Sequence, residues 1–97
     1  MNVIVKTRGL GKTSDLIRLS AEKQIPIVTM DTPKKLQEKA SSMGYDIPTP
    51  LNPSQVHGYS GSTILVDDAD RILSALIGKD IDTLAISPSY WPDVSQR

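Results

Sequence analysis

The stretch Asn2-Val3-Ile4-Val5-Lys6-Thr7-Arg8-Gly9-Leu10-Gly11-Lys12-Thr13 decides the fold of this 97-residue chain. Its first half is β-branched and nearly all apolar, which is typical of a strand buried on both faces in a parallel sheet. A glycine-rich turn follows, and the residues from Lys12 to about Lys23 have the apolar periodicity of a helix. A strand, a glycine-rich loop and a helix in this order form the context that a phosphate-binding loop requires.

The chemistry of the turn accounts for its residue types. Glycine lets the backbone curl around a polyanion, toward which the amides of residues 9 to 13 can point. The N-terminus of the following helix adds a favourable partial positive charge. Lys12 can reach the β and γ phosphates of a nucleotide, and the Thr13 hydroxyl can bind Mg²⁺. The alternative is a plain glycine turn that precedes a helix and carries a lysine by chance.

The rest of the chain alternates expected strands and helices. Helices are predicted at residues 33–43 and 69–77, followed by Gly44 and Gly78, and strands at residues 25–30, 62–66 and 81–86. Residues 45–61 hold three of the seven prolines and are predicted to form a loop or lid, with at most a short helical turn near Pro53 to His57. Alternation of this kind predicts an α/β fold with a parallel sheet. We expect one domain over residues 1–88 and a tail over residues 89–97.

The segment Ile64-Leu65-Val66-Asp67-Asp68 places acidic residues where the third expected strand ends. Ligands of open α/β sheets bind at the carboxyl ends of the strands. Mg²⁺ takes oxygen ligands and keeps several waters, so one carboxylate is enough to hold it. Asp67 is therefore a candidate metal ligand.

Residues 6–13 resemble the Walker A motif of P-loop NTPases, although Lys6 stands where that motif has its first glycine. The remainder, Gly9-x-Gly11-Lys12-Thr13, resembles the form found in helicase-like and RecA-like ATPases, and residues 64–68 resemble the Walker B element. Because one expected strand separates the two motifs, the resemblance is to the additional-strand class, which includes RecA-like, helicase and AAA+ ATPases. It implies a three-layer sandwich with a four-stranded parallel sheet in the order 2-3-4-1, a truncated RecA-like P-loop fold.

The resemblance implies binding of a nucleoside triphosphate, ATP by preference, with Mg²⁺, and it leaves slow hydrolysis open. Lys12 and Asp68 are the catalytic candidates, with Asp68 placed to orient an attacking water; alternatively, Asp68 only caps the following helix. Thr13 and Asp67 are the metal candidates. Arg71 is either an arginine finger that acts on a neighbouring copy or an ordinary surface residue. The nucleotide-binding candidates are Arg8, Gly9, Leu10, Gly11, Lys12, Thr13 and Ser14.

Composition narrows the classes of partner. Eleven basic and eleven acidic residues balance, so nucleic acid is not a favoured partner. Cysteine is absent and His57 is the single histidine, which excludes thiolate sites and disfavours histidine-based metal sites. No apolar run approaches the roughly 20 residues of a membrane span, and residues 1–10 lack the apolar stretch of a secretory signal. We therefore expect a cytoplasmic protein with no membrane partner.

Gly44-Tyr45-Asp46-Ile47-Pro48-Thr49-Pro50, in a chain this short, resembles small phage or mobile-element ATPase-like proteins, which implies the cytoplasm of a bacterial host. A second hypothesis is a non-catalytic P-loop-fold module that docks on a larger phage or host machine, or a DNA-handling accessory protein. A shortened sheet would expose an edge strand, and such edges invite a partner strand or a second copy. A homo-oligomer or a protein partner therefore stays open.

Overall fold

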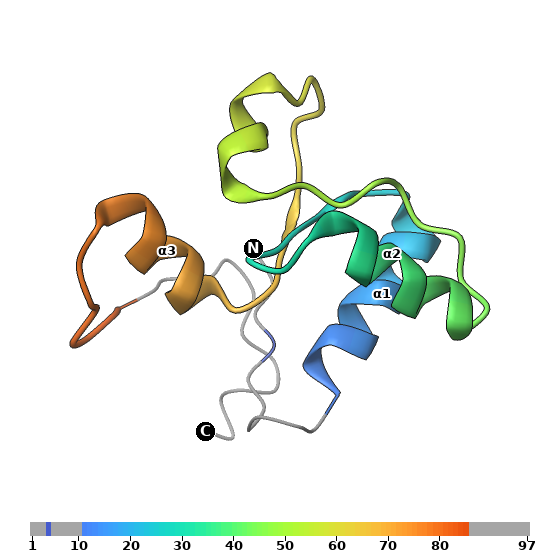
Figure 1. Ribbon diagram of the computed structural model, residues 1–97, viewed down its shortest axis with the longest axis horizontal. Helices are drawn as coiled ribbons and strands as arrows, with labels where there is room; N and C mark the ends of the chain where they lie inside the picture. Colours follow the sequence, from blue (N-terminus) through green and yellow to red (C-terminus); the bar gives the residue numbers. More distant parts are fainter. Residues whose placement is uncertain (1–3, 5–10, 86–97) are drawn as a thin grey trace.

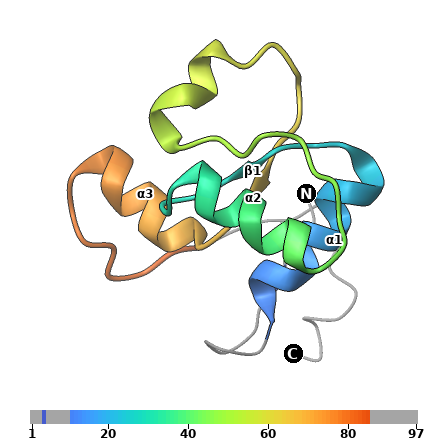
Figure 2. The same cartoon turned by 45° about the vertical axis from the view of Figure 1, so that its right-hand side comes forward.

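The computed structural model describes residue 4 and residues 11–85 (Figure 1). The elements follow in the order α1 (Lys12–Lys23), β1 (Ile27–Val28), α2 (Pro33–Ser42), the 3-10 helix η1 (Pro53–Gly58), β2 (Leu65–Val66) and α3 (Ala69–Ile77). Helices α1 and α2 lie together on one side of the strand pair, and α3 lies on the other side (Figures 1 and 2).

The three α-helices confirm the sequence prediction, with α2 ending one residue early. Pro33 opens α2, where its missing N–H has no partner within the helix in any case. Gly78 ends α3 in the left-handed conformation, with φ of 81°, which glycine adopts without a steric penalty. Within residues 11–85, no helix is both long enough and apolar enough to pass through a bilayer.

The hydrophobic core lies between α1, β1, α2 and the segment that follows α2. Ile17 of α1, Ile27 of β1 and Ala40 of α2 are each 0% exposed. Burial of such aliphatic side chains is the main source of stability in a small domain. This packing fixes α1 against β1, and so it determines where the N-terminus of α1 lies. The core cluster consists of Leu16, Ile17, Ile27, Leu36, Ala40 and Ile47.

Strand β1 is hydrogen-bonded along both of its edges. On one edge it pairs in parallel with β2, with Ile27 opposite Leu65. On the other edge, Val28 forms an isolated parallel bridge with Leu51, whose amide donates to the Ile27 carbonyl at 2.9 Å. An extended residue from the proline-rich segment therefore occupies the position of a third strand beside β1.

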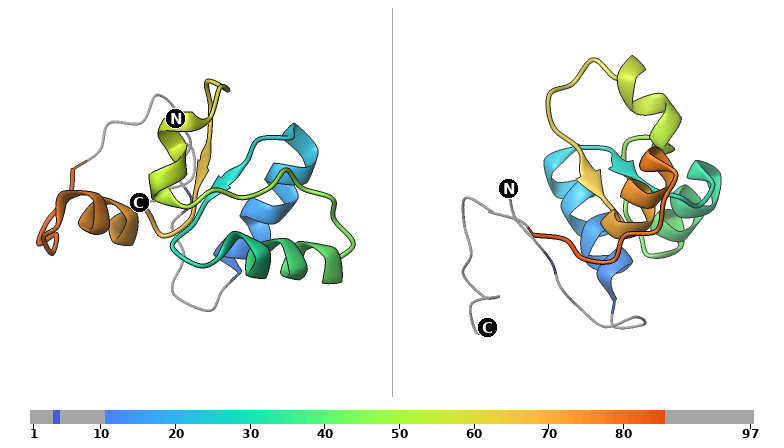
Figure 3. Two further views of the ribbon diagram at one scale, coloured as in Figure 1. Left: turned by 45° about the horizontal axis from the view of Figure 1, so that its top comes forward. Right: turned by 90° about the vertical axis from the view of Figure 1, so that its left-hand side faces the viewer.

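The proline-rich segment is attached to the body of the protein in its first half. Ile47 and Pro50 are buried, and Leu51 reaches β1 as described above. The predicted helical turn is present as η1, Pro53–Gly58, which lies in the excursion of the chain between Leu51 and β2 (Figure 3). Ile47 and Pro50 thus belong to the core layer, whereas Asp46 and Thr49 between and beside them are exposed.

The predicted four-stranded parallel sheet in the order 2-3-4-1, and with it the three-layer RecA-like sandwich, is wrong. In the described part of the chain the sheet has two strands, β1 and β2. Residues 81–85 form no strand, and Leu84 is 51% exposed. No described layer covers this segment, and a strand whose apolar side chains stay in solvent gains little from pairing. Of the predicted first strand, only Ile4 is described, and it is not in a strand.

Strand β2 is also shorter and more exposed than predicted. It spans Leu65–Val66 instead of residues 62–66, and Ile64 and Val66 are exposed. β-Branched composition indicates that a segment fits a pleated surface, but burial requires a layer packed on each face. The β-branched composition of residues 62–66 is visible in the sequence, but the layers that would have to pack on each face of the strand are not.

Candidate functional site

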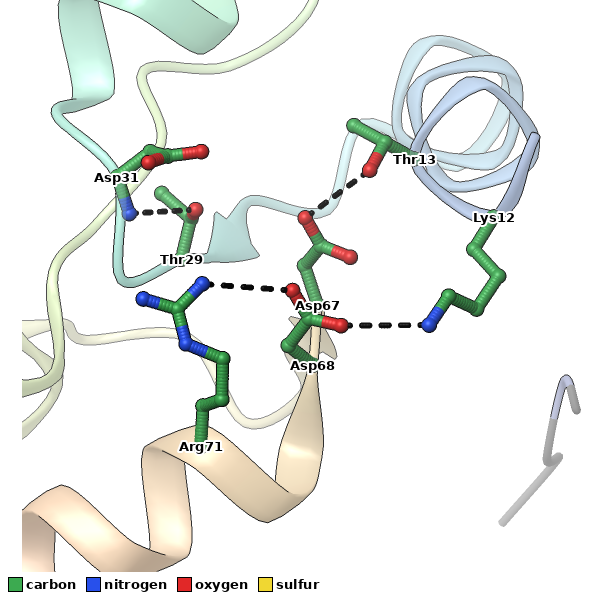
Figure 4. Close-up of polar contacts among 7 residues, drawn as sticks. All are labelled: Lys12, Thr13, Thr29, Asp31, Asp67, Asp68 and Arg71. Atoms are coloured by element: carbon green, nitrogen blue, oxygen red, sulfur yellow. Dashed lines mark hydrogen bonds and ion pairs between the residues drawn. The ribbon is translucent and has the colours of Figure 1, made fainter. Parts of the chain in front are cut away.

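Two segments that are distant in the sequence meet at the N-terminus of α1 (Figure 4). Lys12 and Thr13 form the first turn of α1, and Asp67 and Asp68 follow the end of β2. The Thr13 hydroxyl donates to Oδ2 of Asp67 at 3.2 Å. The Lys12 ammonium donates to Oδ1 of Asp68 at 3.3 Å. The structure therefore brings four of the sequence-predicted site residues together in two adjacent pairs.

The N-terminus of α1 presents backbone amides that have no partner within the helix. Gly11 occupies the N-cap position of α1 with φ of 86° and ψ of 22°. Because glycine has no side chain, no side-chain hydrogen bond caps the helix. The first helical hydrogen bond runs from the Asp15 amide to the Gly11 carbonyl at 3.0 Å. The amides of Lys12, Thr13 and Ser14 precede that bond and have no carbonyl partner within the helix. The other nucleotide-binding candidates lie outside the described residues: Arg8, Gly9 and Leu10.

Asp67 is a buried carboxylate, with 7% of its surface exposed. Burial raises the pKa of Asp67 above its usual value, and the neighbouring Asp68 raises it further. The Thr13 hydrogen bond and the Lys12 ammonium act in the opposite direction, and Asp31 adds a smaller rise to the pKa. The protein therefore compensates the negative charge of Asp67 only in part.

Asp68 occupies the N-cap position of α3, but its side chain makes no cap hydrogen bond. Its carboxylate instead faces Lys12 on one side and Arg71 on the other, with Nη1 of Arg71 at 3.8 Å. The backbone of Asp68 is left-handed, with φ of 54°, a conformation that costs a non-glycine residue about 1–2 kcal/mol. The alternative in which the Asp68 side chain only caps the helix is thus not what the structure shows.

Three further residues lie near the same edge of the sheet: Thr29, Asp31 and Arg71. The sequence did not predict that any of them belongs to the site of its own chain. Thr29 is buried at the end of β1, and its hydroxyl accepts a hydrogen bond from the Asp31 amide at 3.1 Å. Arg71 points toward Asp68 (Figure 4). The carboxyl ends of parallel strands share one edge of a sheet, so the rule that selected Asp67 also applies to the residues after β1.

The oxygen donors suit Mg²⁺. No group of three or more His, Asp or Glu side chains in the described residues forms a metal cluster. A nucleotide-bound Mg²⁺ does not need one, because it is held by one or two carboxylates, by waters and by the phosphates of its substrate. The Thr13 hydroxyl and the Asp67 carboxylate, 3.2 Å apart, are donors of this kind. The residues present therefore fit the ion that the motifs imply.

Comparison of the chain with protein-family models, curated proteins and solved structures found no match. No family membership follows, and the resemblance to P-loop NTPases rests on the motif residues.

Proposed function

We propose that this chain binds a nucleoside triphosphate, ATP by preference, together with Mg²⁺ at the N-terminus of α1. The observation that carries the proposal is the double pairing of Lys12 with Asp68 and of Thr13 with Asp67. These partners are separated by 56 and 54 positions in the sequence. Chance juxtaposition of one such pair is ordinary, but two adjacent pairs formed by the two motifs support a common site.

The groups at the helix terminus suit a polyphosphate. The amides of Lys12, Thr13 and Ser14 point out of the end of α1, where the helix dipole favours an anion. The Lys12 ammonium supplies a full positive charge, and charge-assisted hydrogen bonds to phosphate are stronger than neutral ones. Thr13 and Asp67 would hold Mg²⁺, which neutralises charge on the β and γ phosphates.

We further propose that any hydrolysis is slow, with Asp68 as the residue that orients the attacking water. The Asp68 side chain is 35% exposed, so a water can reach it. Transition-state charge on the phosphoryl group would be met by Lys12, because Arg71 is engaged with Asp68. An arginine that directly contacts the transferring phosphoryl group is typically worth about 10³- to 10⁵-fold in rate, and its absence limits turnover.

Calorimetry with Mg-ATP, Mg-GTP and Mg-ADP tests this function. The wild type should bind ATP, and Lys12→Ala should weaken binding about 10- to 100-fold, because a hydrogen bond to a charged group contributes about 1.5–3 kcal/mol. Lys35→Ala, which removes an exposed lysine from α2, is the matched control and should bind like the wild type. Absence of binding by the wild type, or equal binding by Lys12→Ala, would refute the proposal.

A second candidate function is a binding module whose assembly the nucleotide controls. It is favoured by the apolar side chains that α3 leaves in solvent, Leu76 at 63% and Ile77 at 62% exposed. A contiguous patch of exposed apolar side chains is a feature of contact surfaces, and these two residues would form part of one. Light scattering with and without Mg-ATP should then show a change in mass that Leu76→Asp abolishes. A constant monomer mass under both conditions would rule out self-assembly.

A further inference from the structure

The Asp68 carboxylate is shared between two cations of its own chain. Oδ1 accepts a hydrogen bond from the Lys12 ammonium at 3.3 Å, and Oδ2 lies 3.8 Å from Nη1 of Arg71. Figure 4 shows Asp68 between these two side chains, with Lys12 reaching it from α1 and Arg71 from α3. Asp68 and Arg71 are three residues apart, which keeps both on one face at the start of α3.

Lys12 has two competing partners in this arrangement. In the structure its ammonium is paired with Asp68, and in the proposed function it grips phosphate. The side chains of Lys12 and Asp68 are 31% and 35% exposed, so neither is locked in place by burial. Ion pairs at this exposure contribute little to stability and open readily. A polyphosphate, with several negative charges, can therefore displace the single carboxylate.

We propose that Arg71 is a positioning residue. It holds the Asp68 carboxylate in place when phosphate replaces that carboxylate as the partner of the Lys12 ammonium. This inference rests on the proposed nucleotide binding. Without nucleotide, the Asp68 carboxylate neutralises the Lys12 ammonium and keeps it at the N-terminus of α1. With nucleotide, the Lys12–Asp68 pair opens, and the Arg71–Asp68 pair keeps the carboxylate beside the phosphates, where it can accept a hydrogen bond from water.

The arrangement predicts opposite effects for the two partners of one ion pair. Removing the charge of Asp68 frees Lys12 and tightens phosphate binding. Removing the charge of Arg71 leaves Asp68 with Lys12 as its one remaining cationic partner among these three residues, and so weakens phosphate binding. An Arg71 that touched phosphate itself would weaken binding whether or not residue 68 is charged. The dependence on residue 68 therefore separates positioning from direct contact.

The test is a double-mutant cycle read by calorimetry, with Mg-ATP and with inorganic tripolyphosphate as probes. Asp68→Asn should lower the Kd about two- to fivefold, the range that an exposed ion pair supports. Arg71→Gln should raise the Kd by a similar factor, and Arg71→Lys should restore it. In the Asp68→Asn background, Arg71→Gln should have no effect, which a purely structural role would not produce.

Two matched controls remove general charge effects. Asp70→Asn removes the same charge from the same turn of α3, at a residue that is not in the Lys12 pair. Arg18→Gln disrupts another Arg–Asp pair with i,i+3 spacing, Arg18 with Asp15 on α1; the Arg18 and Arg71 side chains are 55% and 54% exposed. Both controls should bind like the wild type. If Arg71→Gln fails to fold, the comparison of Asp68→Asn with Asp70→Asn decides.

The outcomes separate this inference from the proposed function. Lys12-dependent binding that is unchanged in Asp68→Asn and Arg71→Gln overturns the inference and leaves the function intact. Equal weakening by Arg71→Gln in both backgrounds overturns it in favour of direct phosphate contact. Equal tightening by Asp68→Asn and Asp70→Asn overturns it in favour of bulk charge. Absence of binding by the wild type refutes the proposed function, and the inference, which rests on that function, is overturned with it.

Discussion

Asp67 carries a charge that disfavours folding and that the proposed Mg²⁺ binding would use. It is buried beside a second carboxylate, and both features raise its pKa. The Thr13 hydroxyl and the Lys12 ammonium lower the pKa, but they offset the rise only in part. A buried charge without full compensation destabilises the folded state. The same charge is what a divalent cation requires. A carboxylate with a perturbed pKa that contacts residues of a second motif is a candidate binding residue.

Asp67→Asn should therefore stabilise the metal-free protein at neutral pH. The pKa of Asp67 is raised in the folded state, so the folded protein holds its proton to higher pH than the unfolded chain does. The stability linked to this proton is present at low pH and is lost as the pH rises through the raised pKa. The advantage of Asp67→Asn should accordingly shrink as the pH falls toward about 4, the ordinary pKa of aspartate.

Thermal unfolding in EDTA at pH 7, 5 and 4 measures this difference in Tm. Asp80→Asn, which removes an exposed carboxylate beyond α3, is the control for a change in net charge. An advantage of Asp67→Asn that stayed constant over this pH range would contradict the assignment.

The backbone conformation of Gly11 also shapes the candidate site, because Gly11 precedes the first turn of α1. Its φ of 86° is left-handed, and an added Cβ would meet no atom within 4 Å. Gly11→Ala should therefore destabilise the protein by about 1 kcal/mol through backbone strain alone. Gly58→Ala is the matched control, because Gly58 also has no atom within 4 Å of an added Cβ and lacks the positive φ. Urea unfolding measures both, and equal effects would count against strain at Gly11.

At the scale of elements, β1 is short but central. It spans Ile27–Val28, both residues are almost fully buried, and it is hydrogen-bonded to β2 on one edge and to Leu51 on the other. Helix α3 is its opposite, with Ile72 buried and its C-terminal end in solvent. Stability should therefore be concentrated around β1 and α1, and α3 should contribute less.

Ile27→Ala and Ile77→Ala test this contrast with the same chemical change. Ile27 is 0% exposed, and its truncation should cost about 2–5 kcal/mol, because the cavity left behind adds to the lost burial. Ile77 is 62% exposed, and its truncation should change stability by less than about 0.5 kcal/mol. Denaturant midpoints measure both, and a large loss for Ile77→Ala would show that α3 is covered in solution.

At the scale of the whole molecule, the candidate site exists only in the folded chain. Its two halves come from the start of α1 and the end of β2, and packing of α1 on β1 brings them together. A ligand that binds these groups therefore binds the folded state and not the unfolded one. Ligand binding and global stability must then be coupled.

Mg-ATP should raise the Tm in proportion to its affinity. At 100 times the Kd the stabilisation is about 2.7 kcal/mol, which in a domain of this size corresponds to about 10–20 °C. Lys12→Ala should lose most of this shift, and EDTA should reduce it in the wild type. Adenosine, which lacks phosphates, should give no shift. A shift of equal size with adenosine would place recognition on the base and contradict the phosphate site.

The sequence by itself determined the three helices and, at Gly78, the residue that ends α3. Helical hydrogen bonds join residues four positions apart, and signals such as Pro33 and Gly78 act locally, so a short window contains what is needed. The sequence also predicted that acidic residues would follow β2 at the carboxyl edge of a parallel pair. Asp67 and Asp68 do lie there.

Only the tertiary structure decided how many strands pair and how the charges are shared. The apolar run at residues 81–85 resembles a strand but forms none, whereas Leu51, in a proline-rich segment, lies beside β1. The Asp68–Arg71 spacing of three residues is local, but the sequence does not show that Lys12 would pair with the same carboxylate. The sheet bonds and the Lys12–Asp68 ion pair join groups that are far apart in the chain, so their partners are set by the packing of the whole molecule and not by any local pattern.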